Sequence, residues 1–175
     1  TVALIEKEKE IAETVRTSGV TWISDINEFG IPKECYNPIK KFSFCSPKNY
    51  VTITDNVAKA AVLDVRKTYR FLATRSKSSG SELFTGTNVS EVLKNSAGKC
   101  VGVVAKSQGK LIQFNAKVVI DASGFTSIVA KELGYVTQWK KFGAGAEFEV
   151  KTEKLEYDNW WLMVGQEYSP AGYAW

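Results

Sequence analysis

The sequence predicts an α/β fold in which a parallel sheet is followed by a β-meander and by the start of an antiparallel sheet. Three observations support this prediction. The β-branched run 118–121 passes through a small residue and a glycine into a helical segment at 128–133, the order of a strand, a turn and a helix. Four short apolar runs, separated by glycine-containing turns, lie between residues 82 and 114. After residue 134 the composition becomes aromatic and strand-like.

The first thirty residues predict a strand, a charged segment and a short helix. Val2–Glu6 is typical of a buried strand, and residues 7–15 are typical of a charged helix or turn before the polar loop 16–19. Apolar residues three apart within 20–29 predict an amphipathic helix that Gly30 ends.

The next fifty residues predict a hairpin, a strand and a longer helix. Runs 39–45 and 50–54 alternate apolar and polar side chains around a turn-like segment at 46–49, which is the pattern of a β-hairpin. A short strand is expected at 62–65. The helix expected at 66–79 has apolar residues on one face and a glycine at its end.

The second half of the chain predicts mostly strands. The meander is expected to contain strands at 82–84, 89–93, 100–105 and 111–114. It leads back into the strand 118–121 and the helix at 128–133. Residues 140–151 and 160–165 are then expected to form strands.

Composition excludes several classes of function. The 175 residues carry a net charge of +4 with scattered lysines, which does not predict a nucleic-acid interface. The sequence has no apolar run of the length of a membrane span and no signal-peptide pattern. It contains no histidine, so catalytic triads and zinc sites that use histidine are excluded. Three cysteines without close spacing predict buried thiols in a reducing compartment, and we predict no metal site.

Asp121 is the strongest candidate for a ligand-binding residue. It ends the predicted strand, and in open α/β sheets ligands gather at the carboxyl ends of strands. Its carboxylate can accept a hydrogen bond from a ligand hydroxyl, and Gly124 allows the backbone to approach a phosphate near a helix start. The alternative is an ordinary strand–turn–helix in which Ser123 or Thr126 caps the helix.

Glu6 is a second candidate, because it ends the first predicted strand. A carboxylate at this place in a βαβ unit accepts hydrogen bonds from ribose hydroxyls. The alternative is a solvated charge, since residues 6–10 alternate in sign.

The order of motifs along the chain resembles a known family. A strand ends in Glu6, an Arg-x-x-Gly loop follows at 16–19, and the segment 66–73 reads Arg-Lys-Thr-Tyr-Arg-Phe-Leu-Ala. Val-Ile-Asp-Ala-Ser-Gly stands at 119–124 and Pro-Ala-Gly-Tyr-Ala-Trp at 170–175. The chain resembles the geranylgeranyl reductase family, FAD-dependent oxidoreductases of the aromatic-hydroxylase type. The last motif is similar to the family's Pro-x-x-Tyr-x-Trp pattern, which continues into Phe-Pro.

The resemblance implies an FAD/NAD(P)-binding Rossmann-like fold and a set of site residues. The cofactor FAD would be bound by Glu6, Arg16, Arg66, Asp121 and Gly124. Arg16 is placed near the flavin and Asp121 at the ribityl chain or at a water on the pyrophosphate. Tyr173 and Trp175 would contact the substrate. No catalytic residue is predicted: some family members have a cysteine after the loop arginine, where this chain has Thr17.

Each of these assignments has a simpler alternative. Arg16 is equally expected as a surface arginine, and Arg66 as the partner of a salt bridge within the fold. The aromatic residues near the end of the chain could line an apolar cavity, or they could pack a sheet face against a core; for Trp160 and Trp161 the packing role is favoured.

The resemblance also implies domains and boundaries. Residues 1–134 would form an FAD-binding domain with a hairpin insertion at about 35–60, and residues 135–175 would begin a substrate domain. The family starts with a strand and a Gly-x-Gly-x-x-Gly turn, and it extends beyond the Tyr-x-Trp motif. We therefore expect this chain to be an internal piece of a longer flavoprotein.

The implied activity is reduction of carbon–carbon double bonds in a prenyl, geranylgeranyl-type chain. Its implied partners are a prenyl lipid or another apolar small molecule and an external electron donor, without nucleic acid. A cytoplasmic protein in peripheral contact with a membrane is expected. The proton source is left open between a tyrosine, a cysteine and water. Two alternatives remain: a flavin-dependent monooxygenase or halogenase relative, and a non-catalytic fragment of a flavoprotein.

Overall fold

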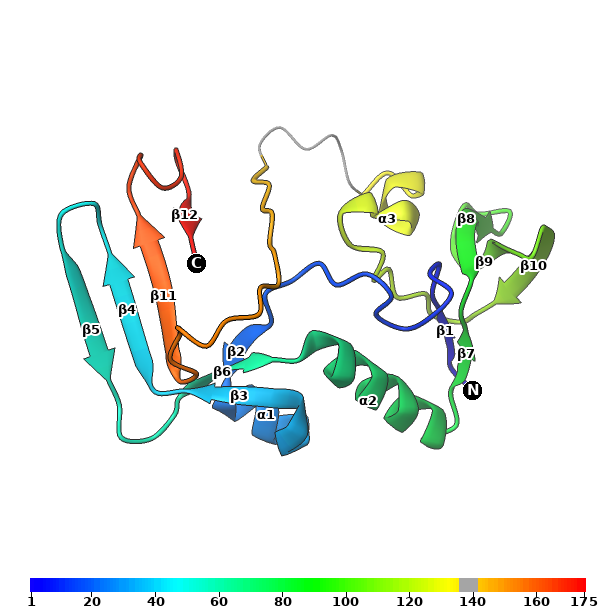
Figure 1. Ribbon diagram of the computed structural model, residues 1–175. Helices are drawn as coiled ribbons and strands as arrows, with labels where there is room; N and C mark the ends of the chain where they lie inside the picture. The colour runs from blue at the N-terminus through cyan, green and yellow to red at the C-terminus, as the bar shows by residue number, and fades with distance from the viewer. Residues whose placement is uncertain (136–141) are drawn as a thin grey trace. The chain divides into compact units, whose positions relative to one another are not determined.

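The computed structural model describes residues 1–135 and 142–175, and these residues form several small sheets with few helices (Figure 1). The first is a parallel pair of β1 (Ala3–Ile5) and β7 (Glu82–Phe84). Backbone hydrogen bonds from Glu6 N–H to the Phe84 carbonyl and from Thr87 N–H to the Glu6 carbonyl, each 2.9 Å, continue this pairing past the end of β1.

The predicted meander is confirmed as an antiparallel sheet of three strands. It contains β8 (Thr87–Lys94), β9 (Cys100–Ser107) and β10 (Lys110–Asn115), with β9 in the middle. The central strand is apolar and tightly packed, and its residues Val103, Val104 and Ala105 are buried.

Two short helical segments follow the meander, η2 (Gly124–Thr126) and α3 (Ile128–Glu132). The Glu132 carboxylate accepts a hydrogen bond from the Val92 N–H at 2.7 Å, and the Lys94 ammonium donates to the Glu132 carbonyl at 2.9 Å. These bonds join the end of α3 to β8.

A second antiparallel sheet contains β2 (Val20–Trp22), β6 (Ala60–Leu63) and β3 (Tyr36–Ile39), in that order. Two short helices accompany it, α1 (Ile23–Glu28) and η1 (Lys33–Cys35). The core here consists of small and branched apolar side chains: Ile26, Cys35, Ile39, Ala60, Ala61 and Val65. Burial raises the pKa of the Cys35 thiol, so this cysteine is an inert core residue, as predicted.

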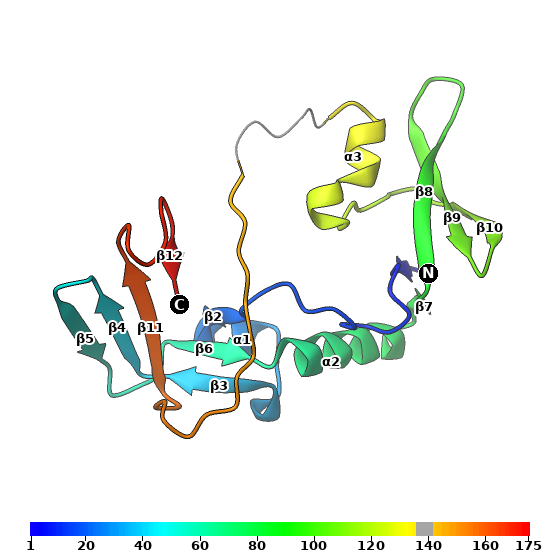
Figure 2. The ribbon, with the colours of Figure 1, turned by 45° about the horizontal axis from the view of Figure 1, so that its top comes forward.

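The largest sheet joins residues from both ends of the chain. Its order is β12 (Tyr173–Ala174), β11 (Asn159–Val164), β4 (Lys41–Cys45) and β5 (Tyr50–Thr54). The predicted hairpin is confirmed as β4 and β5, and β11 lies parallel to β4, as Figures 1 and 2 show from two sides. A crossover of more than 100 residues therefore separates these two neighbouring strands.

Helix α2 (Val65–Ser78) is the longest helix, and it confirms the helix expected at 66–79. Asp64 precedes it and caps it, because its carboxylate accepts a hydrogen bond from the Lys67 N–H at 3.0 Å. The hydrogen bond from the Lys67 ammonium, 2.9 Å away, together with this backbone hydrogen bond, lowers the pKa of Asp64.

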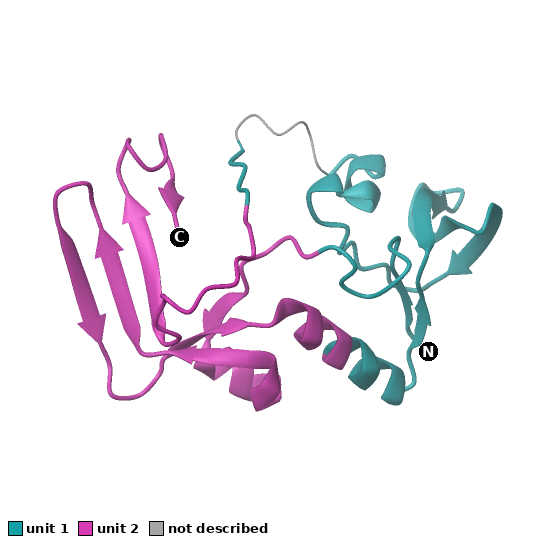
Figure 3. Cartoon of the chain, in the orientation of Figure 1, with its two compact units in different colours: residues 1–14, 72–146 teal, residues 15–71, 147–175 magenta. Residues whose placement is uncertain are grey.

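The described residues group into two compact units (Figure 3). Unit 1 comprises residues 1–14 and 72–146, and unit 2 comprises residues 15–71 and 147–175. Each contains its own sheets. The predicted domain boundary near residue 134 and the insertion at 35–60 stay predictions.

Four local predictions are wrong. Residues 118–121 do not form a strand, and Val118 and Ile120 are 77% and 85% exposed. The reason is that no other strand among the described residues pairs with them, and an extended segment becomes a strand only through such pairing. For a related reason β1 is not buried: among the described strands it pairs only with β7, and both Leu4 on it and Val2 just before it are exposed.

The third wrong prediction is the helix expected at 20–29. Residues 20–22 pair with β6 as strand β2, so the helix expected at 20–29 is shortened to α1. Pairing with a neighbouring strand overrides a three-residue apolar spacing when the segment is this short.

The fourth wrong prediction is the strand expected at 140–151. Residues 142–151 are exposed and do not form a strand, while residues 140–141 lie outside the described residues. The strand expected at 160–165 is confirmed as β11.

Candidate functional site

The four-stranded sheet of unit 2 has one wholly apolar face. Side chains at paired positions of neighbouring strands lie on the same face, and alternate residues of one strand lie on opposite faces. The register pairs Trp160 with Phe42 and Leu162 with Phe44, and it pairs Phe42 with Ile53. We call this surface the apolar sheet face; it comprises Phe42, Phe44, Val51, Ile53, Trp160, Leu162, Val164 and Tyr173.

Trp160 occupies the centre of the apolar sheet face. Its ring meets Phe42 and Phe44 edge to face, with centroids 6.1 and 6.5 Å apart. This is the packing role that the sequence favoured. The indole Nε1 is buried and has no hydrogen-bond partner among the described residues.

The two predicted substrate residues lie together on this sheet. Tyr173 lies beside Val164 on the apolar sheet face, and its ring centroid is 5.9 Å from that of Trp175. Their side chains are exposed, at 56% and 45%. Trp161 lies on the opposite face, because it pairs with Ser43.

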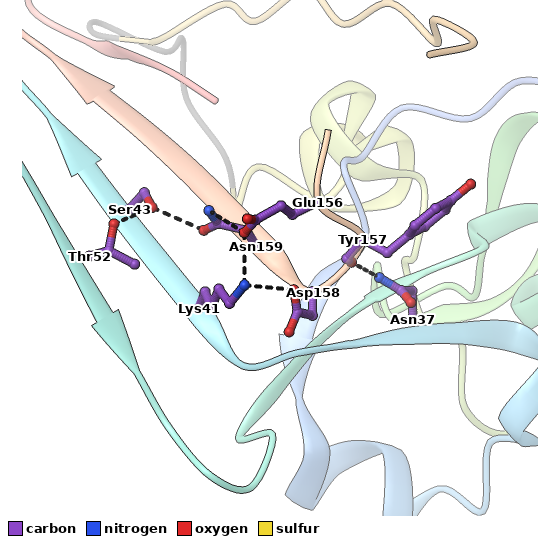
Figure 4. Close-up of polar contacts among 8 residues, drawn as sticks. All are labelled: Asn37, Lys41, Ser43, Thr52, Glu156, Tyr157, Asp158 and Asn159. Carbon is purple, nitrogen blue, oxygen red and sulfur yellow. Dashed lines mark hydrogen bonds and ion pairs between the residues drawn. The ribbon is translucent and has the colours of Figure 1, made fainter. Parts of the chain in front are cut away.

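The opposite face of the same sheet combines polar side chains with Trp161, Met163 and Cys45. The Ser43 hydroxyl is buried and forms hydrogen bonds with the Thr52 hydroxyl at 2.8 Å and with the Asn159 side-chain carbonyl at 3.0 Å (Figure 4). These side chains come from three adjacent strands. Among its described residues, the apolar sheet face carries no such group of hydrogen-bonded polar side chains.

A set of polar contacts holds the start of β11 against β4. The Lys41 ammonium lies 2.9 Å from the Glu156 carboxylate and 3.6 Å from that of Asp158 (Figure 4). The hydrogen bond to Glu156 raises the pKa of Lys41. The Asp158 carbonyl accepts two backbone hydrogen bonds, from the N–H groups of Lys40 and Lys41.

We call these contacts the β4–β11 clamp: Lys41, Glu156 and Asp158, with Asn37, whose side-chain amide donates to the Tyr157 carbonyl. Sequence reasoning did not identify the clamp. Lys41 and Glu156 are 115 residues apart, and no local pattern connects them. The clamp ends two residues before Trp160 and holds the start of β11, the strand that carries this tryptophan.

In unit 1, the structure gives Asp121 a role at the start of a helix. Its carboxylate accepts hydrogen bonds from the Ser123 N–H at 3.1 Å and hydroxyl at 2.6 Å, and from the Ala130 N–H at 2.9 Å. Partial burial alone would raise the pKa of Asp121, but hydrogen bonds from the Ser123 side chain and from backbone N–H groups of α3 outweigh it and leave the pKa lowered. The helix-capping alternative is also seen for Ser123, whose hydroxyl accepts from the Ile128 N–H.

Replacement of Asp121 by alanine is expected to destabilise the protein by about 1 kcal/mol at neutral pH, the usual effect of losing a helix cap. Because the folded-state pKa is lowered, this contribution is complete above the ordinary carboxyl pKa of about 3.9 and is lost as pH falls through the folded value. Urea unfolding of both proteins at neutral pH and at about pH 3 measures it. Glu91→Ala, at an exposed acid of β8, is the control. A difference that does not shrink in acid contradicts the prediction.

Gly124 and Glu6, the other predicted cofactor residues of unit 1, both present accessible polar groups. Gly124 has a φ of +65° and nothing within 4 Å of the place where a Cβ would stand. The Glu6 carboxylate lies just past the end of β1 and accepts a hydrogen bond from the Glu8 N–H at 2.8 Å. Both positions suit a ligand at a strand end, and their predicted roles remain predictions.

Arg16 and Arg66 lie in unit 2, in segments that the fold brings together. Gly19 ends the loop of Arg16, and a Cβ on it would stand 2.8 Å from the Leu63 carbonyl and 2.8 Å from the Val65 side chain. The Leu63 N–H also donates to the Gly19 carbonyl at 2.9 Å. The Arg-x-x-Gly loop therefore packs on the junction of β6 and α2. One of the residues it meets there, Val65, directly precedes Arg66 in the chain.

No protein-family model matches the chain. It is 29% identical over 182 residues to the digeranylgeranylglycerophospholipid reductase of Methanocella arvoryzae, a match that covers 99% of this chain and 46% of that protein. The chain thus spans about half the length of this curated relative.

Solved structures show the same fold. A geranylgeranyl bacteriochlorophyll reductase-like protein from Thermoplasma acidophilum superposes with a TM-score of 0.71 at 18% identity, over 97% of this chain and 45% of that protein. A flavin-dependent brominase superposes with a TM-score of 0.62 at 21% identity, over 77% of this chain and 34% of that protein. The comparisons support the resemblance and the fold class: the chain is similar in sequence to a digeranylgeranylglycerophospholipid reductase, and it shares the mixed α/β fold of these solved structures.

Proposed function

We propose that the protein containing this chain is an FAD-dependent oxidoreductase that reduces carbon–carbon double bonds in the prenyl chains of a glycerophospholipid. The name of the relative from Methanocella arvoryzae supports this substrate class. The observation that carries the proposal is the apolar sheet face, which presents aromatic and branched side chains without a charged residue.

The apolar sheet face suits a prenyl chain because both surfaces are apolar. A methyl-branched chain also needs close, shape-matched contact. Several of its side chains are exposed although they are apolar: Val51 at 56%, Ile53 at 53%, Val164 at 43% and Tyr173 at 56%. A contiguous exposed apolar surface of this kind marks a binding site more often than a solvated surface. Contact with such a surface would hold an isolated double bond in one orientation.

The residues of unit 1 are compatible with FAD in part. Glu6 and Gly124 offer an acceptor and an open backbone, as ribose and phosphate groups require. The Asp121 carboxylate holds the start of α3, and its expected contact with the ribityl chain or with a water on the pyrophosphate stays a prediction. When bound, FAD would supply the hydride. The contacts expected of Arg16 and Arg66 with FAD stay predictions.

The test uses the product of the complete reading frame that contains this chain, supplied with FAD. Under anaerobic conditions and a chemical reductant, a geranylgeranyl glycerophospholipid is expected to gain two hydrogens for each double bond reduced, as mass spectrometry measures. Oxygen-dependent formation of a hydroxylated or halogenated product would support the monooxygenase or halogenase alternative instead. A protein that stays colourless after FAD addition would support the non-catalytic alternative.

The double replacement Tyr173→Ala and Trp175→Ala is expected to raise KM for the prenyl lipid about tenfold, because two aromatic contacts with the chain are lost. The flavin absorbance spectrum should not change. Tyr50→Ala is the matched control: Tyr50 is also an exposed aromatic residue of this sheet, at 73%, but it pairs with Cys45 on the other face. Equal effects of the two replacements would contradict a role for the apolar sheet face in substrate binding.

A further inference from the structure

Strand β5 forms an open edge of the four-stranded sheet in unit 2. The sheet order places β4 on one side of β5, and among the described strands none pairs with its other side, as Figures 1 and 2 show. All five residues of β5 are exposed. The backbone N–H and C=O groups along such an edge are a template for pairing with a further strand.

The backbone groups that β5 turns outward can be assigned from its ladder with β4. The Asp55 N–H donates to the Lys40 carbonyl at 2.9 Å, which continues the ladder just past the end of β5. Hydrogen-bonded pairs alternate along an antiparallel ladder, so the odd-numbered residues of β5 also bond to β4. The even-numbered residues turn their N–H and C=O groups to the open edge: Tyr50, Thr52 and Thr54.

Strand β5 has none of the features with which proteins usually protect an edge strand. Such edges commonly carry a charged residue, a proline or a bulge. The sequence Tyr-Val-Thr-Ile-Thr contains neither a charge nor a proline, and its pairing with β4 is regular over all five residues. These residue types also have high β propensity. The open edge is therefore suited to accept another strand.

The sequence of β5 is complementary to itself in an antiparallel pair centred on Thr52. Thr52 then lies opposite the second copy's Thr52, Tyr50 opposite its Thr54, and Val51 opposite its Ile53. Threonine pairs and pairs of an aromatic with a β-branched residue are among those that stabilise sheets, and the third pair is apolar on both sides. Because the outward-facing residues of both copies meet, about six backbone hydrogen bonds form.

The charges that flank β5 favour the same arrangement. Lys48 precedes the strand and Asp55 follows it. In the pair centred on Thr52, Asn49 lies opposite the second copy's Asp55, so the neighbouring Lys48 comes close to a carboxylate. Twofold symmetry repeats this attraction at the other end of the pair. Asp55 also has a partner within its own copy, since Lys59 lies 3.0 Å away.

We propose that the protein forms a homodimer in which β5 of one copy pairs antiparallel with β5 of a second copy. The two sheets then form one sheet, and Val51 and Ile53 join the apolar sheet faces of the two copies side by side. A strand of five residues is only about 17 Å long, so the pairing buries less than the roughly 800 Å² per partner of a standard interface. The dimer is therefore weak and reversible.

Sedimentation velocity of the product of the complete reading frame tests the proposal. The natural protein is expected to change from monomer to dimer as its concentration rises through the micromolar range. Thr52→Lys should weaken the dimer by about tenfold or more, because residue 52 faces itself and two like charges would meet. Thr52→Val is the matched control and should dimerise like the natural protein. Both replacements remove the hydroxyl that bonds to Ser43, but valine adds no charge.

A mixing experiment tests the centre of the pair. Thr52→Glu should be monomeric by itself, as Thr52→Lys is, but an equimolar mixture of the two variants should form dimers because opposite charges then meet. Circular dichroism checks that each variant is folded. The proposal is overturned if the natural protein stays monomeric throughout, if Thr52→Lys leaves its dimer intact, or if the mixture does not associate.

Hydrogen exchange of the natural protein gives a readout that needs no variant. The outward N–H groups of Tyr50, Thr52 and Thr54 should exchange more slowly at high protein concentration than at low concentration. Those of Val51 and Ile53 should not change, because they already bond to β4. A dimer that leaves all five amides unaffected uses another surface and contradicts the proposal. Association is measured without substrate, so its outcome is independent of the proposed function.

Discussion

Gly19→Ala is expected to destabilise the protein by about 2–4 kcal/mol. The added Cβ would stand 2.8 Å from the Leu63 carbonyl, which is held in the β2–β6–β3 sheet and has little freedom to move. Gly19 also has a φ of +73°, which an alanine adopts only with strain. Chemical denaturation measures the change in the free energy of unfolding.

Gly98→Ala separates the two causes. Gly98 has a similar φ of +76°, but nothing lies within 4 Å of its would-be Cβ. It should therefore lose only about 1 kcal/mol, the part that comes from backbone strain. If both variants are destabilised equally, the close packing of the Arg-x-x-Gly loop on the β6–α2 junction is not what holds the loop in place.

Trp160→Ala is expected to have the second large effect, a loss of about 3 kcal/mol of folding stability. Replacement of a tryptophan in a packed environment by alanine leaves a cavity, and here it removes the edge-to-face contacts with Phe42 and Phe44. Thermal unfolding followed by circular dichroism measures it. The same variant should also bind the prenyl lipid more weakly, because the centre of the apolar sheet face is gone.

Trp161→Ala is the matched comparison. Trp161 is the next residue of the same strand, but it lies on the opposite face and is 38% exposed. The replacement should cost about 1 kcal/mol and leave lipid binding unchanged.

The sequence predicted the elements whose signals are local. Alternation in 39–45 and 50–54 specified β4 and β5, the apolar face of 66–79 specified α2, and glycine turns specified the meander. These patterns lie within the element or in the turn that joins its neighbours. They depend on no distant part of the chain.

What the sequence could not predict depends on distant partners. The run 118–121 has the composition of a strand, but composition does not provide the neighbour that a strand needs, and Val118 remains exposed. The parallel pairing of β11 with β4 and the β4–β11 clamp join residues about 115 apart, for which no motif exists. Asp121 was predicted as a candidate because it is the last residue of this run. Its hydrogen bonds to Ser123 and α3 depend on the geometry of the turn, which the residue types alone do not determine.

The pairing of β4 with β11 also bears on how the protein is made. The hairpin of β4 and β5 emerges from the ribosome well before β11, because Glu156, the partner of Lys41, is synthesised 115 residues later. Throughout that interval Phe42 and Phe44 lack the ring of Trp160. Closure of so long a loop is slow, and a nascent chain with uncovered aromatic side chains is prone to aggregate. Synthesis of this protein should therefore depend on chaperones that shield the early hairpin until translation has passed residue 164.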